Sequence, residues 1–571
     1  MKKWAAVSVN AIHRMSLVDV WAVFLSLGWL LPNHYLPWIA FHTDAWIAWM
    51  LVLIGARVVI RSRDHRSEWT ELMVVASLVT VIPFIQYAGG VLDFSGQAWV
   101  TTAYLIGFLA SLMLGYRWEM IAANEALNAL FFAICFACLV SVGMQLYQWL
   151  SLDGLDLWIV NMAGNRPFAN LVQPNQLGTF LFWGLIGIGW FVHQKKLGVQ
   201  TAVFMAMFFL AGIALTRSRT TTFAIGFGIL AAWYWRSLWF TKIRMQIVVG
   251  LIAFFLICQL SIGPISNALL LSQPFDEIAR ISGTGVRFDA YRLFIDAAMQ
   301  MPLSGFGWTN LSAAQMLVAE RHPQLGGIFQ HAHNLFLDLI LWAGLPIGLL
   351  LSAFLLRWFY LQFKRVATVE DALLLFFVGV FAWHAMLELP HQYAYMLLPV
   401  GLIMGIQDAR GESRIRFKTH RLTFTSLWLA AATLLAVVTH DYFRIEADFQ
   451  ALRFERQYGM PAPKKPPETL VLSQLEAFIA MGRLEARSGM SQGQIDWMRK
   501  TAESFPSPAN QYVYMAALAL NDQADLAQKR MRILQKVMGV AEYEALGEIW
   551  TQQSVTNVQL AKTKWLSIAT N

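Results

Sequence analysis

Long apolar runs constrain this chain more than any other feature, and they recur from Leu17 to Val438. A helix needs about 20 mostly apolar residues to cross the hydrocarbon core of a bilayer. Backbone polar groups in lipid must be satisfied internally, which favours helices for such runs. Only 14% of the residues are charged and 57% are hydrophobic, whereas a soluble domain carries more charge on its surface. We therefore predict an all-α, polytopic membrane protein.

The runs predict about thirteen membrane-spanning helices. They are centred on residues 15–31, 45–60, 72–88, 99–115, 122–150, 175–193, 199–215, 220–235, 245–262, 335–356, 371–388, 392–407 and 423–439. The run at 122–150 is either one long helix or a helix followed by an interfacial piece. The first run follows Lys2, Lys3 and Arg14 but has no small-x-small cleavage site, so we expect a retained helix and not a signal peptide.

Lysines divide the loops between the runs into two sets. If the N-terminus is cytoplasmic, the loops on the opposite side contain no lysine before the last span. This positive-inside bias supports the span count and places the residues after Thr439 outside the membrane, in the periplasm of a Gram-negative cell. The formal net charge of +8 is then loop charge that orients a multi-pass inner-membrane protein, and no nucleic-acid partner is expected.

Two regions are expected to fold outside the membrane. Within a transmembrane domain at 1–440, the long periplasmic loop at about 263–333 is rich in apolar residues such as Phe288, Phe294 and Trp308, which favours a folded cap over a disordered loop. Residues 441–571 are predicted to form a periplasmic helical domain, either tetratricopeptide-like or a plain small helical domain. Its predicted helices are Leu470–Ser488, Ser491–Ser504, Asn510–Leu520 and Asp525–Val537.

The loops on the outer side lack lysine but contain arginine. These arginines are Arg166, Arg217, Arg219, Arg280, Arg287, Arg292 and Arg321. Guanidinium groups bind phosphate in a bidentate manner, and an arginine at the membrane edge suggests function. We therefore predict that Arg217, Arg219 and Arg287 bind a lipid-linked phosphate or pyrophosphate. For Arg280, Arg292 and Arg321, ion pairs with nearby carboxylates or contacts with lipid headgroups are the preferred interpretation.

The segment His331-Ala332-His333-Asn334 lies where the large loop meets a membrane helix. Neutral imidazole is the natural general base near neutral pH. A metal site that includes His322 is the alternative, but no carboxylate is adjacent in the sequence and we expect no metal. Asn334 could also cap the helix that follows.

Two more polar clusters border membrane helices on the outer side. The amide-rich segment from Asn165 to Gly178 contains Gln173 and Asn175, whose side chains could bind sugar hydroxyls or phosphate, or merely satisfy loop backbone. The short turn from Glu388 to Tyr395 contains Tyr393, which could line a site or belong to an interfacial aromatic belt.

A CxxC pair, Cys135 and Cys138, lies inside an apolar run. The pair has no partner pair and little access to water there, so helix packing is preferred over redox or zinc chemistry.

Taken in order along the chain, these motifs resemble the O-antigen ligase/polymerase superfamily. The motifs are Arg166-Pro-Phe with Gln173-Pro-Asn175, Arg217-Ser-Arg219, Gly285-Val-Arg287, Pro302 to Gly307, His331 to Asn334, and Gly344-Leu-Pro. The turn from Pro32 to Trp38, Gln86 and the helical tail are similar to the PglL-type protein O-oligosaccharyltransferases, the pilin glycosylation ligases, within that superfamily.

The resemblance implies a metal-independent, cofactor-free glycosyltransferase. It implies that an oligosaccharide moves from undecaprenyl pyrophosphate to a Ser or Thr hydroxyl of an exported protein, often a type IV pilin. The family's histidine maps onto His333, with His331 beside it. Its phosphate-binding arginines map onto Arg217, Arg219 and Arg287.

Further substrate contacts are expected beside these residues. Arg166 is placed with the pyrophosphate-binding arginines, and Asn175 and Asn334 with the substrate. The branch's functional glutamine and tyrosine map onto Gln173 and Tyr393. One departure is Trp342-Ala343-Gly344, because the family often has an acidic residue before this glycine.

Other functions remain open from the sequence. An O-antigen ligase or polymerase that acts on lipopolysaccharide would share these motifs with a different acceptor. A transporter of the lipid-linked glycan would more often show internal repeats and polar groups at mid-membrane, whereas the polar groups here cluster at one face. A membrane-anchored assembly factor would have no need for outer loops that contain arginine but no lysine.

Overall fold

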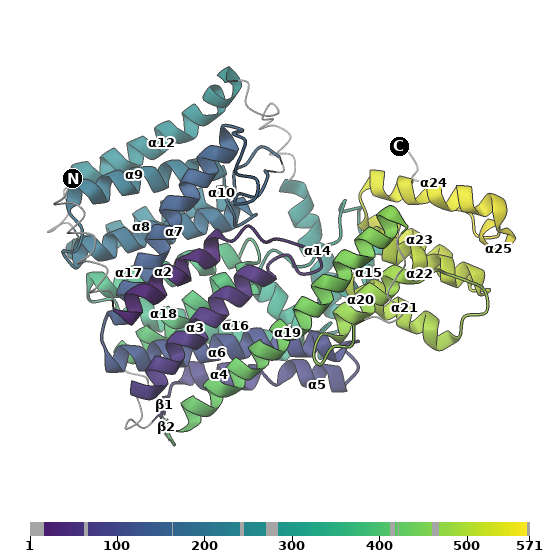
Figure 1. Cartoon of the computed structure of the whole chain (residues 1–571), viewed down its shortest axis with the longest axis horizontal. Coiled ribbons are helices and arrows are strands. Elements are labelled where there is room, and N and C mark those ends of the chain that lie inside the picture. The colour runs from purple at the N-terminus through teal and green to yellow at the C-terminus, as the bar shows by residue number, and fades with distance from the viewer. Residues whose placement is uncertain are drawn as a thin grey trace. The chain divides into compact units, whose positions relative to one another are not determined.

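The structure is a computed structural model that describes residues 16–61, 67–162, 164–239, 245–269, 284–411, 417–420, 422–459 and 467–567 (Figure 1). Helices make up nearly all of its regular structure, which confirms the predicted all-α, polytopic class. Among these residues the strands are β1 (Ser67–Trp69) and β2 (Phe417–Thr419), a short antiparallel pair in which Glu68 lies opposite Lys418.

The helices follow the predicted runs closely. The helices before residue 270 are α2 (Leu17–Leu27), η1 (Gly28–Leu30), α3 (Phe41–Arg61), α4 (Glu71–Val79), α5 (Ile82–Ala88), α6 (Ser95–Ile121), α7 (Glu125–Trp149), α8 (Pro174–His193), α9 (Val199–Thr216), α10 (Arg219–Tyr234), α11 (Arg236–Trp239) and α12 (Met245–Ala268). The next are α14 (Thr284–Gln300), α15 (Leu311–Val318), η2 (Ala319–Arg321), α16 (Leu335–Arg365), α17 (Val369–Ala385), η3 (Pro390–Gln392), α18 (Ala394–Arg410) and α19 (Leu422–Tyr458). The tail contains α20 (Ser473–Arg483), α21 (Gln492–Ser504), α22 (Pro508–Leu520), α23 (Ala524–Val537), α24 (Val540–Thr556) and α25 (Val558–Ala561).

A helix or helix pair stands at every predicted span, and the run at 122–150 is the single helix α7. Within the described part of the chain, 9 helices are long and apolar enough to cross a membrane. They are α3, α4 with α5, α6, α7, α8, α9, α12, α16 and α19. The count of thirteen stays a prediction because four of the predicted spans coincide with shorter helices: α2 with η1 covers only Leu17–Leu30, and α10, α17 and α18 are 16 or 17 residues long.

The contacts divide the chain into two units that are each discontinuous in sequence. The first unit comprises Met1–Ser77, Leu105–Asp276 and Leu356–Leu435, and the second comprises Leu78–Tyr104, Glu277–Leu355 and Ala436–Asn571. The tail therefore shares a unit with residues of the large loop. The division at residue 440 stays a prediction about domains.

Glycines let α7 and α8 of the first unit approach closely. A Cβ atom on Gly184 would lie 2.8 Å from Cys138 Sγ, and one on Gly187 would lie 2.7 Å from Cys135 Sγ. Both thiols are buried and donate weak hydrogen bonds to carbonyl groups of α8. Their place in this interface agrees with the packing interpretation of the CxxC pair.

The tail of the second unit has its own hydrophobic core, formed by α20 to α24, and Figure 1 shows α21, α22 and α23 side by side. Met316 and Ala319 of the large loop belong to the same core. The predicted helix Leu470–Ser488 is shorter in the structure and ends at Arg483. Beyond it, Leu484 and Met490 pack against this core in a non-helical conformation.

Candidate active site

Arg166 joins the polar clusters of the first unit. Its Nε donates to the carbonyl oxygen of Thr216 at 2.9 Å, and its guanidinium NH2 donates to Asn175 Oδ1 at 3.0 Å. Asn175 Nδ2 in turn donates to Glu388 Oε1 at 3.2 Å. The amide-rich segment, the Arg217 turn and the Glu388 turn therefore meet around one arginine. Part of Arg166 is thus used to hold these loops together.

Gln173 begins α8. Its side-chain oxygen accepts a hydrogen bond from the Gln176 N–H at 2.8 Å, and Pro174 occupies the first turn. Both features favour helix initiation at this residue. A substrate-binding role for Gln173 stays a prediction. The structure shows in addition that its side chain caps the start of α8.

Arg217 and Arg219 flank a tight turn between α9 and α10. Arg217 ends α9 in a left-handed conformation with φ 48° and ψ 33°, which is uncommon for a residue with a Cβ atom. Ser218 caps α10 by accepting from the Thr221 N–H at 3.2 Å. Arg217 is half-buried and Arg219 is exposed. The hydrogen bond from Arg166 to Thr216 holds the residue directly before Arg217.

The tyrosine turn is anchored by residues that the sequence interpretation did not select. The Tyr395 hydroxyl donates to Gln176 Oε1, and the Tyr395 N–H donates to Asp44 Oδ1 at 3.0 Å. Tyr393, the predicted substrate residue, stacks obliquely beside Tyr395 with ring centroids 5.3 Å apart. Tyr393 is therefore placed by the buried Tyr395, and its predicted role remains a prediction.

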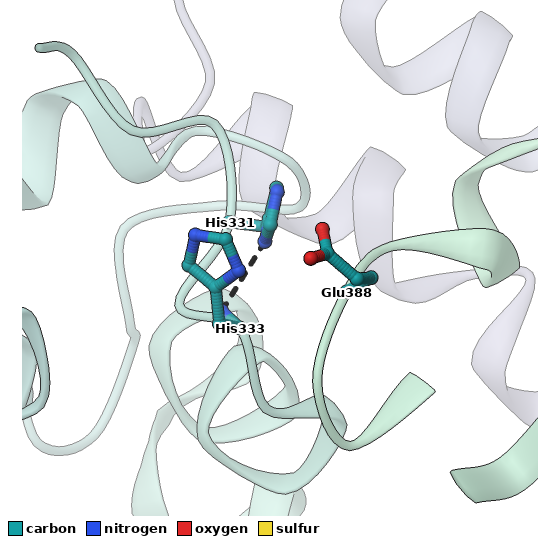
Figure 2. A group of neighbouring side chains, drawn as sticks. All are labelled: His331, His333 and Glu388. Carbon is teal, nitrogen blue, oxygen red and sulfur yellow. Dashed lines mark hydrogen bonds between the residues drawn. The ribbon is translucent and has the colours of Figure 1, made fainter. Parts of the chain in front are cut away.

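The predicted catalytic segment lies in the second unit and has an unusual backbone. His333 has a φ of 55°, a left-handed conformation that costs a non-glycine residue about 1–3 kcal/mol. The His333 N–H donates to His331 Nδ1 at 3.2 Å, and the two rings lie 4.1 Å apart at 65° (Figure 2). Because His331 Nδ1 accepts this bond, the proton of a neutral His331 ring resides on Nε2.

Contacts on three sides hold this conformation. The Tyr291 hydroxyl of α14 donates to the His333 carbonyl oxygen at 3.1 Å. Asp338 Oδ1 of α16 accepts from the Ala332 N–H at 2.7 Å. Asn334 Oδ1 accepts from the N–H groups of Phe336 and Leu337 at 3.1 and 3.2 Å, so Asn334 does cap the helix. The histidine segment is therefore built into both α14 and α16.

Arg287 lies on α14 one turn before Tyr291 and is half-buried. Residues four apart share one face of a helix, so the helix that supports His333 also carries a predicted pyrophosphate ligand.

Other polar residues of the large loop form the ion pairs that were preferred for them. Arg292 pairs with Asp289 at 3.9 Å, and Arg321 pairs with Asp296 at 3.8 Å. His322 Nε2 lies 3.0 Å from Asp296 Oδ2, and this hydrogen bond holds the pKa of Asp296 below its usual value. His322 therefore bonds to a carboxylate of the same loop, and the alternative of a metal site that includes it stays a prediction. Arg280 lies outside the described residues.

His331 and His333 are the residues here that could serve as metal ligands. A metal at His331 would have to bind through Nε2, since Nδ1 accepts the His333 N–H. Catalytic zinc sites usually have three protein ligands, so two imidazoles would need a further donor.

Three supporting residues were not selected from the sequence as site residues, namely Tyr291, Asp338 and Gln176. Asp338 was the most detectable of these, because a carboxylate inside an apolar run is expensive and tends to have a specific partner. It also follows Asn334 by four residues, which places it on the same helix face as the capping residue. Gln176 lies in the amide-rich segment that the sequence analysis selected, whereas nothing in the local sequence marks Tyr291.

Gln86, noted in the sequence, organises a neighbouring part of the second unit. Its Nε2 donates to the Trp342 carbonyl oxygen at 2.6 Å, and its Oε1 accepts from the Trp308 N–H at 3.1 Å. The glutamine therefore links the Trp308 segment of the large loop to α16. The link lies at Trp342, where the sequence departs from the family pattern of an acidic residue before the glycine.

Comparison with known proteins connects this arrangement to a family. Residues 202–352 match the family described as O-Antigen ligase, and residues 372–547 match that described as Virulence factor membrane-bound polymerase, C-terminal. The chain is 28% identical over 543 residues to a General O-oligosaccharyltransferase of Acinetobacter baylyi (strain ATCC 33305 / BD413 / ADP1), which covers 92% of this chain and 93% of that protein.

A second relative from the same organism, a ComP-specific O-oligosaccharyltransferase, is 24% identical over 328 residues, 57% of this chain and 59% of that protein. The histidine segment and Arg287 fall within the part that matches O-Antigen ligase, and Tyr393 falls within the other matched part. These similarities confirm the resemblance and the predicted class of enzyme: the chain is a membrane glycosyltransferase that is similar to the O-oligosaccharyltransferases and matches the O-Antigen ligase family over residues 202–352.

Proposed function

We propose that this protein transfers an oligosaccharide en bloc from undecaprenyl pyrophosphate to a Ser or Thr hydroxyl of an exported protein such as a type IV pilin. The observation that carries the proposal is the similarity to an O-oligosaccharyltransferase over 92% of the chain. We further propose that it works in the inner membrane of a Gram-negative cell with its active site and tail in the periplasm. The absence of lysine from the outer loops supports this orientation.

His333 is the proposed general base, with His331 as the residue that positions it. A serine or threonine hydroxyl is scarcely ionised at neutral pH and needs a base to attack. The hydroxyl oxygen forms a bond to the anomeric carbon of the glycan while its proton moves to the His333 ring. The bond from that carbon to the pyrophosphate oxygen breaks, and undecaprenyl pyrophosphate leaves with the electron pair.

The arginines are proposed to bind the leaving group. Negative charge grows on the pyrophosphate as the bond breaks, and prearranged guanidinium groups stabilise such charge strongly where water is limited. Arg217, Arg219 and Arg287 are assigned this role by their family positions. Arg166 is proposed to bind the pyrophosphate with them, and it also supports the turn that contains Arg217. Gln173, Asn175, Asn334 and Tyr393 are proposed to contact the substrates.

A pair of histidine variants tests the base. His333→Ala should abolish glycosylation of the acceptor while the protein accumulates normally in the membrane. His322→Ala is the matched control, because His322 belongs to the same unit but bonds to Asp296, and it should stay active. Normal acceptor glycosylation by the His333→Ala variant would overturn the assignment.

Chelation tests the proposed independence from metals. Activity of the purified protein should persist in EDTA, because arginine charge replaces a metal at the pyrophosphate. Complete loss of activity that Mn²⁺ or Mg²⁺ restores would show instead that a metal bound through the histidines takes part.

An O-antigen ligase or polymerase acting on lipopolysaccharide is the second candidate, favoured by the match of residues 202–352. Mass spectrometry of periplasmic glycoproteins with and without the gene distinguishes the two acceptors. Loss of glycans from protein supports our proposal, whereas unchanged glycoproteins with altered lipopolysaccharide banding would support the second candidate. Unchanged profiles of both would point to a different activity, such as transport.

A further inference from the structure

The helix that supports His333 has an apolar stripe that no described residue covers. Phe288, Ile295 and Met299 of α14 are exposed by 69%, 56% and 62%, and the side chain of Arg292 is exposed by 80%. Positions 288, 292, 295 and 299 follow the spacing of a single helix face. The opposite face is buried and consists of Ala290, Leu293, Phe294, Ala297 and Ala298. Hence α14 is apolar on both faces, which is unusual for a helix in water.

The chain that leaves α14 extends the stripe. Met301 is 39% exposed and Leu303 is 77% exposed. We call Phe288, Ile295, Met299 and Leu303 the α14 ridge. An apolar surface of this kind on a soluble part of a protein usually marks an interaction site.

The end of the ridge is joined directly to the membrane helix α16. The Leu345 N–H donates to the Pro302 carbonyl oxygen at 2.7 Å, and the Phe306 N–H donates to the Leu341 carbonyl oxygen at 2.7 Å. A Cβ atom on Gly344 would overlap the carbonyl oxygen of Leu303. Leu303 therefore lies at the same level as Gly344 along α16.

Gly344 marks the point where α16 is broken, with φ 81° and ψ 165°. Leu349 and Leu350, just beyond the break, are 54% and 71% exposed and so have the exposure of lipid-facing residues. These exposed leucines belong to a helix that is long and apolar enough to cross a membrane, and the segment that contains Leu303 packs against the break in that helix.

We propose that the α14 ridge rests in the headgroup and acyl-chain interface of the bilayer, so that α14 is a membrane-surface helix whose partner is lipid. Interfacial helices bury their apolar face several ångströms into this zone. The ridge is continuous with the lipid-facing part of α16, which is why lipid fits it better than a protein partner. Arg292 within the stripe can extend to the phosphate groups of lipids while its aliphatic stem stays apolar.

The consequence is that lipid sets the depth of the helix that carries Arg287 and Tyr291. Tyr291 contacts the His333 carbonyl oxygen, so the bilayer surface fixes the height of the histidine segment. This inference does not depend on the proposed reaction, and it can hold or fail without it.

Spin labelling of the full chain in vesicles tests the proposal. Single cysteines are placed at Ile295, Met299 and Leu303 after the three native cysteines are replaced by alanine. Val555→Cys is the matched control, because Val555 is an apolar residue of the tail with 84% exposure. For each label, the collision rate with oxygen is divided by the collision rate with a water-soluble nickel complex. This ratio should be several-fold higher for labels on the ridge than for the label at position 555.

The other outcomes each overturn the proposal. Ridge labels that meet the nickel complex as often as the control would place α14 in water. Labels shielded from both reagents would show that protein covers the ridge, as in a dimer or an acceptor complex. A second experiment needs no substitution: a photoactivatable phospholipid should cross-link to the wild-type protein within 284–303, and absence of such cross-links would equally reject the ridge as a lipid site.

Discussion

Replacing Asp338 tests whether backbone geometry at the histidine segment limits the reaction. Asp338 is fully buried, and its Oδ1 accepts the N–H of Ala332, which is also fully buried, at 2.7 Å. Ala332 lies between the two histidines and directly before the left-handed His333. In Asp338→Leu this buried N–H loses its acceptor.

The magnitude follows from that lost bond. An unsatisfied buried N–H costs about 1–3 kcal/mol, and the segment can avoid this cost by leaving the observed conformation. A shift of that size lowers the population of the competent conformation by roughly 5- to 150-fold. We therefore expect Asp338→Leu to reduce the rate of glycan transfer by a factor in this range with little change in KM for the acceptor.

Asp338→Asn separates geometry from charge. Asparagine keeps the acceptor oxygen but carries no charge, so it should restore the rate to within a few-fold of the wild type. The assay is the initial rate of glycan transfer by purified protein at saturating donor. Hydrogen exchange of the peptide 329–335 is measured in parallel and should increase only in the leucine variant.

Two results would refute this reasoning. A leucine variant with the wild-type rate would show that the bond to Ala332 is dispensable. An asparagine variant as slow as the leucine variant, with normal hydrogen exchange, would show that the charge of Asp338 matters and not its hydrogen bond.

Three further predictions concern stability in detergent. Gly405→Ala should lower the thermal unfolding midpoint by several degrees, because the new Cβ atom would overlap the backbone of α6. Gly250→Ala is the control and should leave the midpoint unchanged, because no atom lies within 4 Å of its Cβ position. Equal midpoints for the two variants would contradict close helix packing at Gly405. Arg483→Met should destabilise the tail by about 3–5 kcal/mol, because the poorly exposed carboxylates of Asp448 and Glu455 lose their partner. Arg499→Met removes a more exposed ion pair and should cost under about 1 kcal/mol. Similar losses of stability for both variants in urea unfolding would contradict this prediction. Burial lowers the pKa of His34, so the unfolded chain binds a proton before the folded chain does as the pH falls through about 6.5. The wild type should therefore lose stability as the pH falls through this value, and His34→Gln should lose less. Identical stability–pH profiles for the two proteins would contradict this prediction.

The apolar runs determined much of the fold by themselves. Whether a stretch of about 20 residues crosses a bilayer depends on its own composition, because each helix satisfies its backbone bonds internally. The all-α class and the positions of the helices therefore followed from local sequence. The histidine motif was also visible locally, since it stands where polar loop gives way to an apolar helix.

Contacts between distant residues required the tertiary structure. Arg166 reaches Thr216 and Asn175, and no local pattern specifies which loop closes on which. The local sequence does not indicate that the Tyr291 hydroxyl donates to the His333 carbonyl oxygen, 42 residues further along the chain. Such pairings depend on the packing of whole helices, and the identity of either residue leaves them undetermined.

The histidine motif shows the division most clearly. The sequence alone established two imidazoles followed by a capping residue at the start of a membrane helix. Only the tertiary structure decided that His333 adopts a left-handed backbone held by Tyr291 and Asp338. The physical reason is that a backbone conformation of higher energy persists only where contacts from several elements stabilise it together.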